Sequence, residues 1–177
     1  RVMLSIPGKL GYGETADPAR PNSPTGPLVF VVDITGRITS DELTPATKDA
    51  TTDSAAVKKL ADRGVTLTGD LGAPAAALAS PQAEQPLQPE VVVVARGKGE
   101  QIKETDTVAV QMSHTSWDGT TRSSTWADHA PSAMLAAQIN AAGLPVGSRI
   151  VLLAPGSSNG GQSQPAYIFV MDLEKVI

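Results

Sequence analysis

Two pairs of short apolar segments repeat near the two ends of the chain. The segment RVMLSIPG (residues 1–8) matches RIVLLAPG (residues 149–156) at an offset of 149 − 1 = 148. The segment PLVFVVDI (residues 27–34) matches AYIFVMDL (residues 166–173) at an offset of 166 − 27 = 139. Each copy predicts a strand, a loop and a second strand. The loop is nine residues shorter in the second copy, which is the difference 148 − 139.

A strand-loop-strand unit cannot bury a core by itself, so each copy needs further elements. The second copy has residues 64–148 directly before it to complete a domain. The first copy has nothing before it, so we expect the chain to begin in the middle of a domain. Its two strands then have open edges that must pair with something. We expect a complementing upstream fragment or another copy in a homo-oligomer to supply the partner.

The region before the second copy shows further strand and turn signals. Residues 91–95 are β-branched, and residues 107–112 alternate between apolar and polar positions. Asp118-Gly119 is a hairpin-turn signal. Residues 132–142 predict one helix, with Leu135 and Ile139 on its apolar face. Strands followed by one helix and more strands favour an α+β domain, an antiparallel sheet with a helix on one face.

The segment between the copies has two parts. Residues 35–63 are rich in Thr, Ser, Asp and Ala and predict a linker that holds one short helix. Asp53 or Ser54 would cap this helix and Gly64 would end it. Its apolar stripe consists of Val57, Leu60 and Ala61. Residues 73–89 contain four prolines and predict an extended or disordered segment.

Composition excludes several classes of function. The net charge of the 177 residues is −4 and the pI is about 5.1, which argues against a nucleic-acid-binding surface. The longest apolar runs have the length of a strand and are too short to span a membrane. Without Cys the chain has no disulfide or thiolate site. A start at Arg1 without Met favours an exported, extracytoplasmic protein, secreted or attached to the cell envelope, and leaves a cytoplasmic location open.

The motif IPGKLGYG (residues 6–13), a Pro-rich loop and PLVFVVDI (residues 27–34) together resemble the end of an FKBP-type peptidyl-prolyl cis-trans isomerase domain. In the second copy, GKG (residues 97–99), Asp118-Gly119, the expected helix and VGSR (residues 146–149) follow in the family's order. The chain thus resembles a tandem bacterial member, of an actinobacterial kind. The resemblance implies a partial first domain at 1–34, a linker at 35–63 and a second domain with an N-terminal extension at 64–177.

This resemblance implies an antiparallel half-barrel sheet wrapped around one helix, and rotation about X–Pro bonds of proline-containing polypeptides. The uncatalysed barrier is roughly 18–20 kcal/mol, because amide resonance is lost as the bond turns. The family's reaction needs no metal or other cofactor. Its apolar pocket favours the twisted amide, so catalysis is differential binding.

In the first copy, the family's two pocket residues fall on Tyr12, whose hydroxyl would bond the substrate carbonyl, and on Phe30. The motif favours the binding role for Tyr12 over that of an ordinary loop aromatic, whereas Phe30 could equally be a core residue. In the second copy the pocket is degenerate, and its aromatic and acidic positions are mostly replaced. Its positions fall on Met112, Arg122 with Ser123, Met134, Ala137 at the pocket floor, Asn159 and Phe169. Met112 and Met134 suit core filling as well as binding.

Other interpretations have weaker support. His114 and His129 with nearby Asp and Ser residues match no metal-ligand or hydrolase spacing. Residues 156–161 lack the ending of a phosphate-binding loop and predict a turn. Three functions remain: an isomerase and folding factor whose first domain is active, a non-catalytic FKBP-like polypeptide-binding or structural module, and an unrelated exported β-rich interaction domain. The repeat and the Tyr-Gly motif argue against the third.

Overall fold

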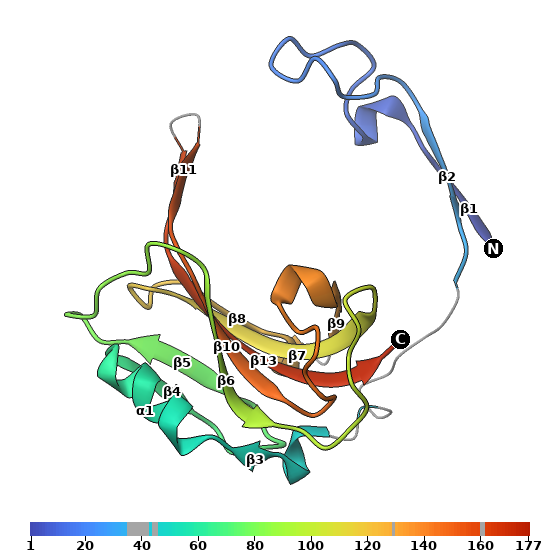
Figure 1. Cartoon of the computed structure of the whole chain (residues 1–177). Helices are drawn as coiled ribbons and strands as arrows, with labels where there is room; N and C mark the ends of the chain where they lie inside the picture. The colour runs from blue at the N-terminus through green and yellow to red at the C-terminus, as the bar shows by residue number, and fades with distance from the viewer. Residues whose placement is uncertain (35–42, 44–45, 129, 160–161) are drawn as a thin grey trace. The chain divides into compact units, whose positions relative to one another are not determined.

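A computed structural model describes residues 1–34, 43, 46–128, 130–159 and 162–177 of the chain. The chain divides into two compact units, Arg1–Arg37 and Ile38–Ile177 (Figure 1). None of the described helices is long and apolar enough to cross a membrane.

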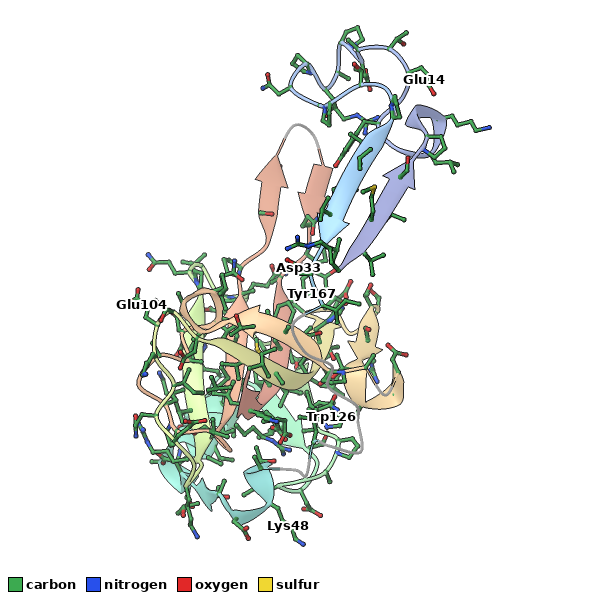
Figure 2. All side chains as sticks on the ribbon, turned by 90° about the vertical axis from the view of Figure 1, so that its right-hand side faces the viewer. Glu14, Asp33, Lys48, Glu104, Trp126 and Tyr167 are labelled. Carbon is green, nitrogen blue, oxygen red and sulfur yellow. The ribbon has the colours of Figure 1, made fainter. Side chains whose placement is uncertain are left out.

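The first unit is a long-looped β-hairpin. Strand β1 (Val2–Ile6) pairs antiparallel with β2 (Leu28–Val32), and a single 3₁₀ turn, η1 (Gly8–Leu10), follows β1. The loop between the strands is held by backbone bonds, among them Gly26 N to Gly13 O at 2.9 Å. Apolar side chains project from both faces of the hairpin (Figure 2). The sheet of this unit therefore has two strands only, among the residues that the structure describes.

The second unit is built on one antiparallel sheet in the order β3-β6-β10-β13-β7-β8, with β9 also pairing β7. Most of its strand pairs are not neighbours in sequence, so the sheet depends on long-range contacts. Sheet-dominated structure with few helices makes the fold α+β, as the sequence predicts. The strands are β3 (Thr51–Thr52), β6 (Glu90–Arg96), β7 (Thr107–Ser116), β8 (Arg122–Ser124), β9 (Ser132–Leu135), β10 (Arg149–Ala154) and β13 (Tyr167–Val176).

Two layers cover this sheet, one on each face (Figure 1). Helix α1 (Ser54–Asp62) and the hairpin β4–β5 (Val65–Thr68, Ala76–Ala79) cover one face. The 3₁₀ turn η4 (Ala136–Ile139) covers part of the other. Three smaller pieces complete the unit: η3 (Ala46–Asp49), α2 (Thr125–Asp128) and the hairpin β11–β12 (Ser157–Asn159, Gln162–Gln164).

Alternation along the strands divides the apolar side chains between two cores. On β10, Val151 and Leu153 belong to the core under α1, whereas Ile150 belongs to the core under η4. Successive side chains of a strand point to opposite faces, so a strand covered on both faces reads as a continuous apolar run. This explains why residues 150–154 contain no polar position.

The prediction of one helix over residues 132–142 is wrong. Ser132–Leu135 form strand β9, and a single 3₁₀ turn replaces the helix. Met134 pairs with Val108 of β7, and Ala136 N donates to Asp106 O at 2.9 Å. Leu135 is 45% exposed, so the Leu135–Ile139 spacing that suggested a helix does not mark a common buried face. This face of the sheet is thus covered by a short turn rather than by the expected helix.

The other predicted helix is confirmed. The Asp53 carboxylate accepts bonds from Ala55 N and Ala56 N at 3.0 Å each, and so caps α1. Leu60 is 1% exposed and lies in the core of the second unit. The part of the expected linker that forms α1 is therefore an integral layer of the second unit. Along the sequence, the boundary between the two units falls between residues 37 and 38.

The internal repeat extends to the register of the strands. With 148 added to β1 numbers and 139 to β2 numbers, all five pairs of β1–β2 become pairs of β10–β13. For example, Val2↔Val32 becomes Ile150↔Met171. The ion pair Arg1–Asp33 becomes Arg149–Asp172, with the same 2.6 Å contact. Two hairpins of one design therefore occur in one chain.

Their surroundings differ completely. Arg149 and Asp172 are each about 1% exposed, whereas the side chains of Arg1 and Asp33 are 71% and 52% exposed. The Arg149 guanidinium also donates to Gly69 O at 3.0 Å and to Ala73 O at 2.9 Å. Thr47 donates its hydroxyl to Asp172 at 2.9 Å. These bonds tie residues 47–73 to the two central strands.

Glu174 lies two residues after Asp172 on β13, and burial raises the pKa of its carboxyl to about 7. The Ala46 amide donates to its carboxyl at 2.6 Å and lowers the pKa, whereas the negative Asp172 raises it further. Glu174 is 6% exposed. Its carboxyl is therefore partly protonated near neutral pH, and this affects the stability of the unit.

We expect Arg149→Met to destabilise the second unit by roughly 3–5 kcal/mol, because it leaves Asp172 buried without a partner. Lys58→Met breaks an exposed pair with Asp62 and should cost at most about 1 kcal/mol. Both Trp residues lie in the second unit, so urea unfolding followed by Trp fluorescence measures its stability. Recovery in the double variant Arg149→Met/Asp172→Leu would attribute the loss to the unpaired charge. Equal losses in the two single variants would contradict the prediction.

Glu174 makes stability depend on pH. The folded state holds this proton more tightly than the unfolded chain, since the pKa rises from 4.5 to about 7. Stability therefore falls as the pH rises through the range between these values, by roughly 3 kcal/mol at most. Glu174→Gln keeps an acceptor for Ala46 N and should remove this fall, whereas exposed Glu104→Gln should not (Figure 2). Urea midpoints at pH 5 and pH 8 test this, and parallel curves for wild type and Glu174→Gln would refute it.

Candidate functional site

Five of the six residues predicted for the pocket of the second copy lie on four strands of the main sheet and on η4, and the sixth lies on β11. Met112 (β7), Met134 (β9) and Phe169 (β13) are half-buried and pack against the core under η4. Arg122 (β8) and Ala137 (η4) are exposed, and the buried neighbour of Ala137 is Ala136. Asn159 ends strand β11 and its side chain lies outside the described part of the chain. Three of the six residues are thus brought to one face of the sheet.

Three aromatic rings form a contiguous patch on that face. His114 of β7 is the cross-strand partner of Phe169, and their ring centroids lie 5.5 Å apart. Tyr167 lies 5.7 Å from His114 in an edge-to-face arrangement and 6.0 Å from Phe169. Such distances are typical of favourable aromatic contacts. We call His114, Tyr167 and Phe169 the aromatic patch.

The aromatic patch includes two residues that the sequence analysis did not select for binding. His114 follows Met112 by two positions on β7, and Tyr167 precedes Phe169 by two positions on β13. Residues two apart on a strand share a face. The alternation around Met112 and Phe169 was therefore the signal that could have identified both. All three rings are half-buried, so part of each remains accessible.

A cavity of about 430 Å³ lies along the edge where β7 meets β8, on the side of the sheet that the hairpin β4–β5 covers. His114 and Arg122 line it from the sheet, and Pro74, Ala75 and Ala76 line it from the segment at the start of β5. A bond from the Ser113 hydroxyl to Ala75 O, 2.6 Å long, fixes that segment against β7. The cavity thus joins a cationic side chain to apolar walls.

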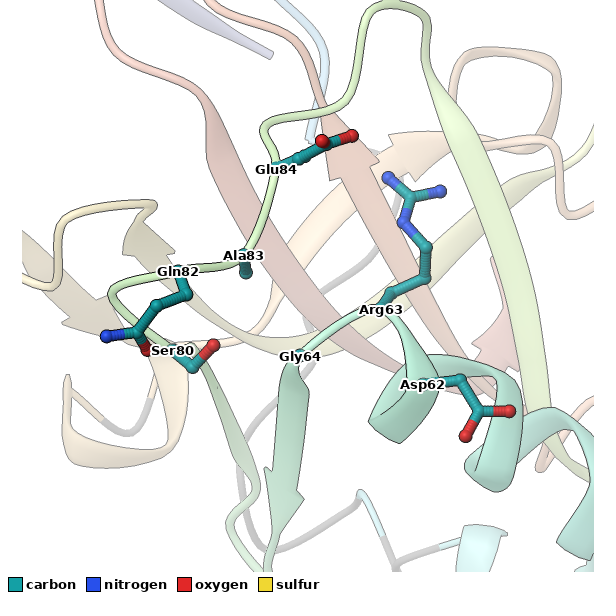
Figure 3. Close-up of a pocket in the computed structure, with 7 residues that line it drawn as sticks. All are labelled: Asp62, Arg63, Gly64, Ser80, Gln82, Ala83 and Glu84. Atoms are coloured by element: carbon teal, nitrogen blue, oxygen red, sulfur yellow. The ribbon is translucent and has the colours of Figure 1, made fainter.

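A second cavity, of about 280 Å³, lies at the other end of the covering layer (Figure 3). It is lined by the end of α1, by Gly64 and by residues 80–84. Two of its charged groups are already engaged: Asp62 with Lys58 and Arg63 with Glu90. The lower pKa of Glu90 follows from the hydrogen bond of Lys59. This polar cavity contains none of the predicted pocket residues.

Trp117 and Trp126 contribute to structure rather than to the patch. Trp117 is 6% exposed, and its Nε1 donates to Ala83 O at 3.0 Å. Trp126 on α2 is half-buried and packs against the core under α1 (Figure 2). The Thr125 hydroxyl oxygen accepts a hydrogen bond from Met112 N at 2.8 Å, and this bond fixes α2 to β7. The bond from Trp117 Nε1 to Ala83 O holds the proline-rich segment 81–86 against the sheet.

Polar side chains near His114 are used in a turn. The Asp118 carboxylate accepts bonds from the Ser116 hydroxyl at 2.6 Å and from Thr120 N at 3.0 Å. These bonds, that of Ser116 above all, lower the pKa of Asp118. Gly119 follows with a φ of +74°, which confirms the predicted hairpin turn. In the described part of the chain no three His, Asp or Glu residues are grouped to hold a metal ion.

The pocket residues of the first copy lie on the surface of the first unit. Tyr12 is 49% exposed in the loop after η1, and Phe30 is 46% exposed on β2. Phe30 is the repeat equivalent of Phe169, and it pairs with Leu4 as Phe169 pairs with Leu152. Their catalytic roles stay a prediction.

Comparison with known proteins finds similarity among solved structures only. No family model matches the chain, and no curated protein matches it. The solved structures that resemble it include FkpA from Escherichia coli, with 21% sequence identity and a TM-score of 0.44. The alignment covers 69% of this chain and 55% of FkpA, so the chain spans little more than half of that structure. The proposals below rest on the residues of this chain.

Proposed function

We propose that the chain is part of an FKBP-type protein-folding factor. Its second unit would bind proline-containing or other apolar polypeptide segments on the aromatic patch and be a poor isomerase. Activity on X–Pro bonds would come from the first domain in its complete form. The aromatic patch carries this proposal, because His114, Tyr167 and Phe169 present three accessible ring faces within about 6 Å of one another.

Aromatic rings bind proline rings and aliphatic side chains through large apolar contact areas. The half-buried Met112 and Met134 extend the apolar surface next to the patch. A methionine adapts its shape to different side chains at low cost, which suits binding of varied polypeptides.

Weak catalysis follows from how the reaction works. The barrier falls only where the twisted amide is bound more tightly than the planar one. Met112 replaces an aromatic wall of the family's pocket, and Arg122 and Ala137 are exposed rather than enclosing. Losing about 3 kcal/mol of binding to the twisted state alone would lower the rate by roughly a hundredfold. Binding without efficient turnover is therefore the function that suits this face.

The alternative function is that of a structural module without a ligand. The tight coupling of residues 47–73 to the sheet favours it, because Arg149 bonds Gly69 O and Ala73 O from within the core. A structural module would not bind short polypeptides through the aromatic patch, so one set of experiments separates the two functions.

We expect a proline-containing peptide to bind the full chain, and Phe169→Ala to weaken this binding about tenfold by removing one ring of the patch. Leu87→Ala is the control, because it removes an apolar side chain that is 95% exposed in a loop of the same unit. NMR titration of labelled protein, with Trp fluorescence to check folding, measures both. Phe169→Leu separates loss of the ring from loss of apolar volume. Equal effects at the two positions, or no binding at all, would contradict the proposed site.

The isomerase part of the proposal has its own test. We expect the full chain to accelerate isomerisation of a proline peptide at least a hundredfold less than an intact FKBP domain does. A coupled isomerisation assay measures this rate. Catalysis near that of an intact domain, lost in Phe169→Ala, would show that the pocket of the second unit has repacked into an efficient one.

A further inference from the structure

Arg122 lies on the face of the sheet opposite to the aromatic patch. Its cross-strand partner on β7 is Thr115, whereas the neighbouring His114 belongs to the aromatic patch. Because successive residues of a strand point to opposite faces, Arg122 and Thr115 share the face that the hairpin β4–β5 covers. The Ser113 hydroxyl, which bonds Ala75 O at 2.6 Å, points to the same face. Arg122 therefore lies outside the site proposed above for polypeptides.

The cavity of about 430 Å³ on this face has an unbalanced charge. Arg122 is the only Lys or Arg side chain among its described lining residues, and these include no Asp or Glu. The ion pairs of the described residues use other cations, namely Arg1, Arg20, Lys58, Lys59, Arg63 and Arg149. Nε of Arg122 donates to Gly119 O at 3.3 Å, which leaves its two terminal nitrogens for a ligand. A guanidinium in these surroundings attracts an anion and can bond both oxygens of a carboxylate.

Hydroxyl groups lie beside Arg122 in the cavity. Ser124 follows Arg122 by two positions on β8 and pairs with Ser113, as Arg122 pairs with Thr115. These four side chains form one block on the covered face, since cross-strand Cβ atoms lie about 5 Å apart. Thr115 is 3% exposed, and its hydroxyl bonds no other described residue. A buried hydroxyl without a partner costs free energy, so a ligand oxygen at this point would be stabilising.

The remaining walls of the cavity are small and apolar. Pro74, Ala75 and Ala76 line it from the covering segment, and Ala127 lines it from α2. Its volume lies within the range of roughly 300–1,000 Å³ that is typical of ligand pockets. An inorganic anion would leave these walls in water, whereas a short aliphatic group would remove them from water. The lining thus combines a site for an anion with space for a few methyl groups.

We propose that this cavity binds a carboxylate attached to a short aliphatic group. The carboxylate bonds the terminal nitrogens of Arg122 and accepts hydrogen bonds from the Thr115 and Ser124 hydroxyls. The aliphatic group lies against Pro74–Ala76. A free short-chain acid and the C-terminal residue of a polypeptide both present this chemistry. The site is separate from the aromatic patch and does not depend on the function proposed for that patch.

The test is an NMR titration of the labelled full chain with isobutyrate. We expect saturable shifts of the amides at residues 75, 76, 115 and 122–124, and none with isobutyramide, which has the same shape without the charge. Inorganic phosphate should bind more weakly because it cannot fill the apolar part. Tighter binding of a peptide that ends in Ala with a free carboxylate would assign the site to polypeptide ends, and equal binding would assign it to a free acid. Equal binding of isobutyrate and isobutyramide, or no saturable shifts at millimolar ligand, would overturn the proposal.

Two pairs of variants test the residues of the cavity. Arg122→Gln should weaken isobutyrate binding about tenfold, because it removes a charge-assisted hydrogen bond. Arg96→Gln, which changes an exposed arginine at the end of β6, is the matched control and should leave the affinity unchanged.

Ala127→Glu adds an acid at an exposed position of the lining and should also weaken binding, whereas the neutral Ala127→Gln of similar size should not. Phe169→Ala should leave carboxylate binding unchanged, because the aromatic patch lies on the other face. Trp fluorescence checks that each variant is folded. Unchanged affinity in Arg122→Gln, or equal losses in the two Ala127 variants, would refute the proposal.

Discussion

The second unit depends on the buried ion pair between Arg149 and Asp172. A buried charge is tolerated only when its partner and its remaining hydrogen-bonding groups are satisfied. Here the guanidinium bonds the carboxylate and two backbone carbonyls, and the carboxylate accepts a hydroxyl from Thr47. The pair therefore requires residues 47–73 to lie against the sheet. The covering layer, which precedes most strands of the sheet in sequence, is in this way coupled to the two central strands of the sheet.

The same sequence design has two outcomes in this chain. In the second unit, flanking strands and covering layers bury the hairpin and its Arg–Asp pair. In the first unit the same registers and the same 2.6 Å contact persist at the surface. An exposed pair contributes little stability because water and salt screen it. Local pairing thus needs only the hairpin itself, whereas burial needs elements from elsewhere.

The binding proposed for the second unit uses side chains rather than backbone groups. The aromatic patch offers ring faces on a sheet whose strands are already paired, so it can bind side chains but adds no strand.

The sequence by itself determined the repeat, the strands of its two copies, the capped helix α1 and the hairpin turn at Asp118-Gly119, because alternation, capping and turn chemistry act over a few residues. It predicted a helix over residues 132–142 wrongly, since pairing of Met134 with Val108 is a long-range contact. It also missed His114 and Tyr167, which become one patch with Phe169 only when β7 lies beside β13. Tertiary structure alone decided these points, because strands distant in sequence meet only in the folded sheet.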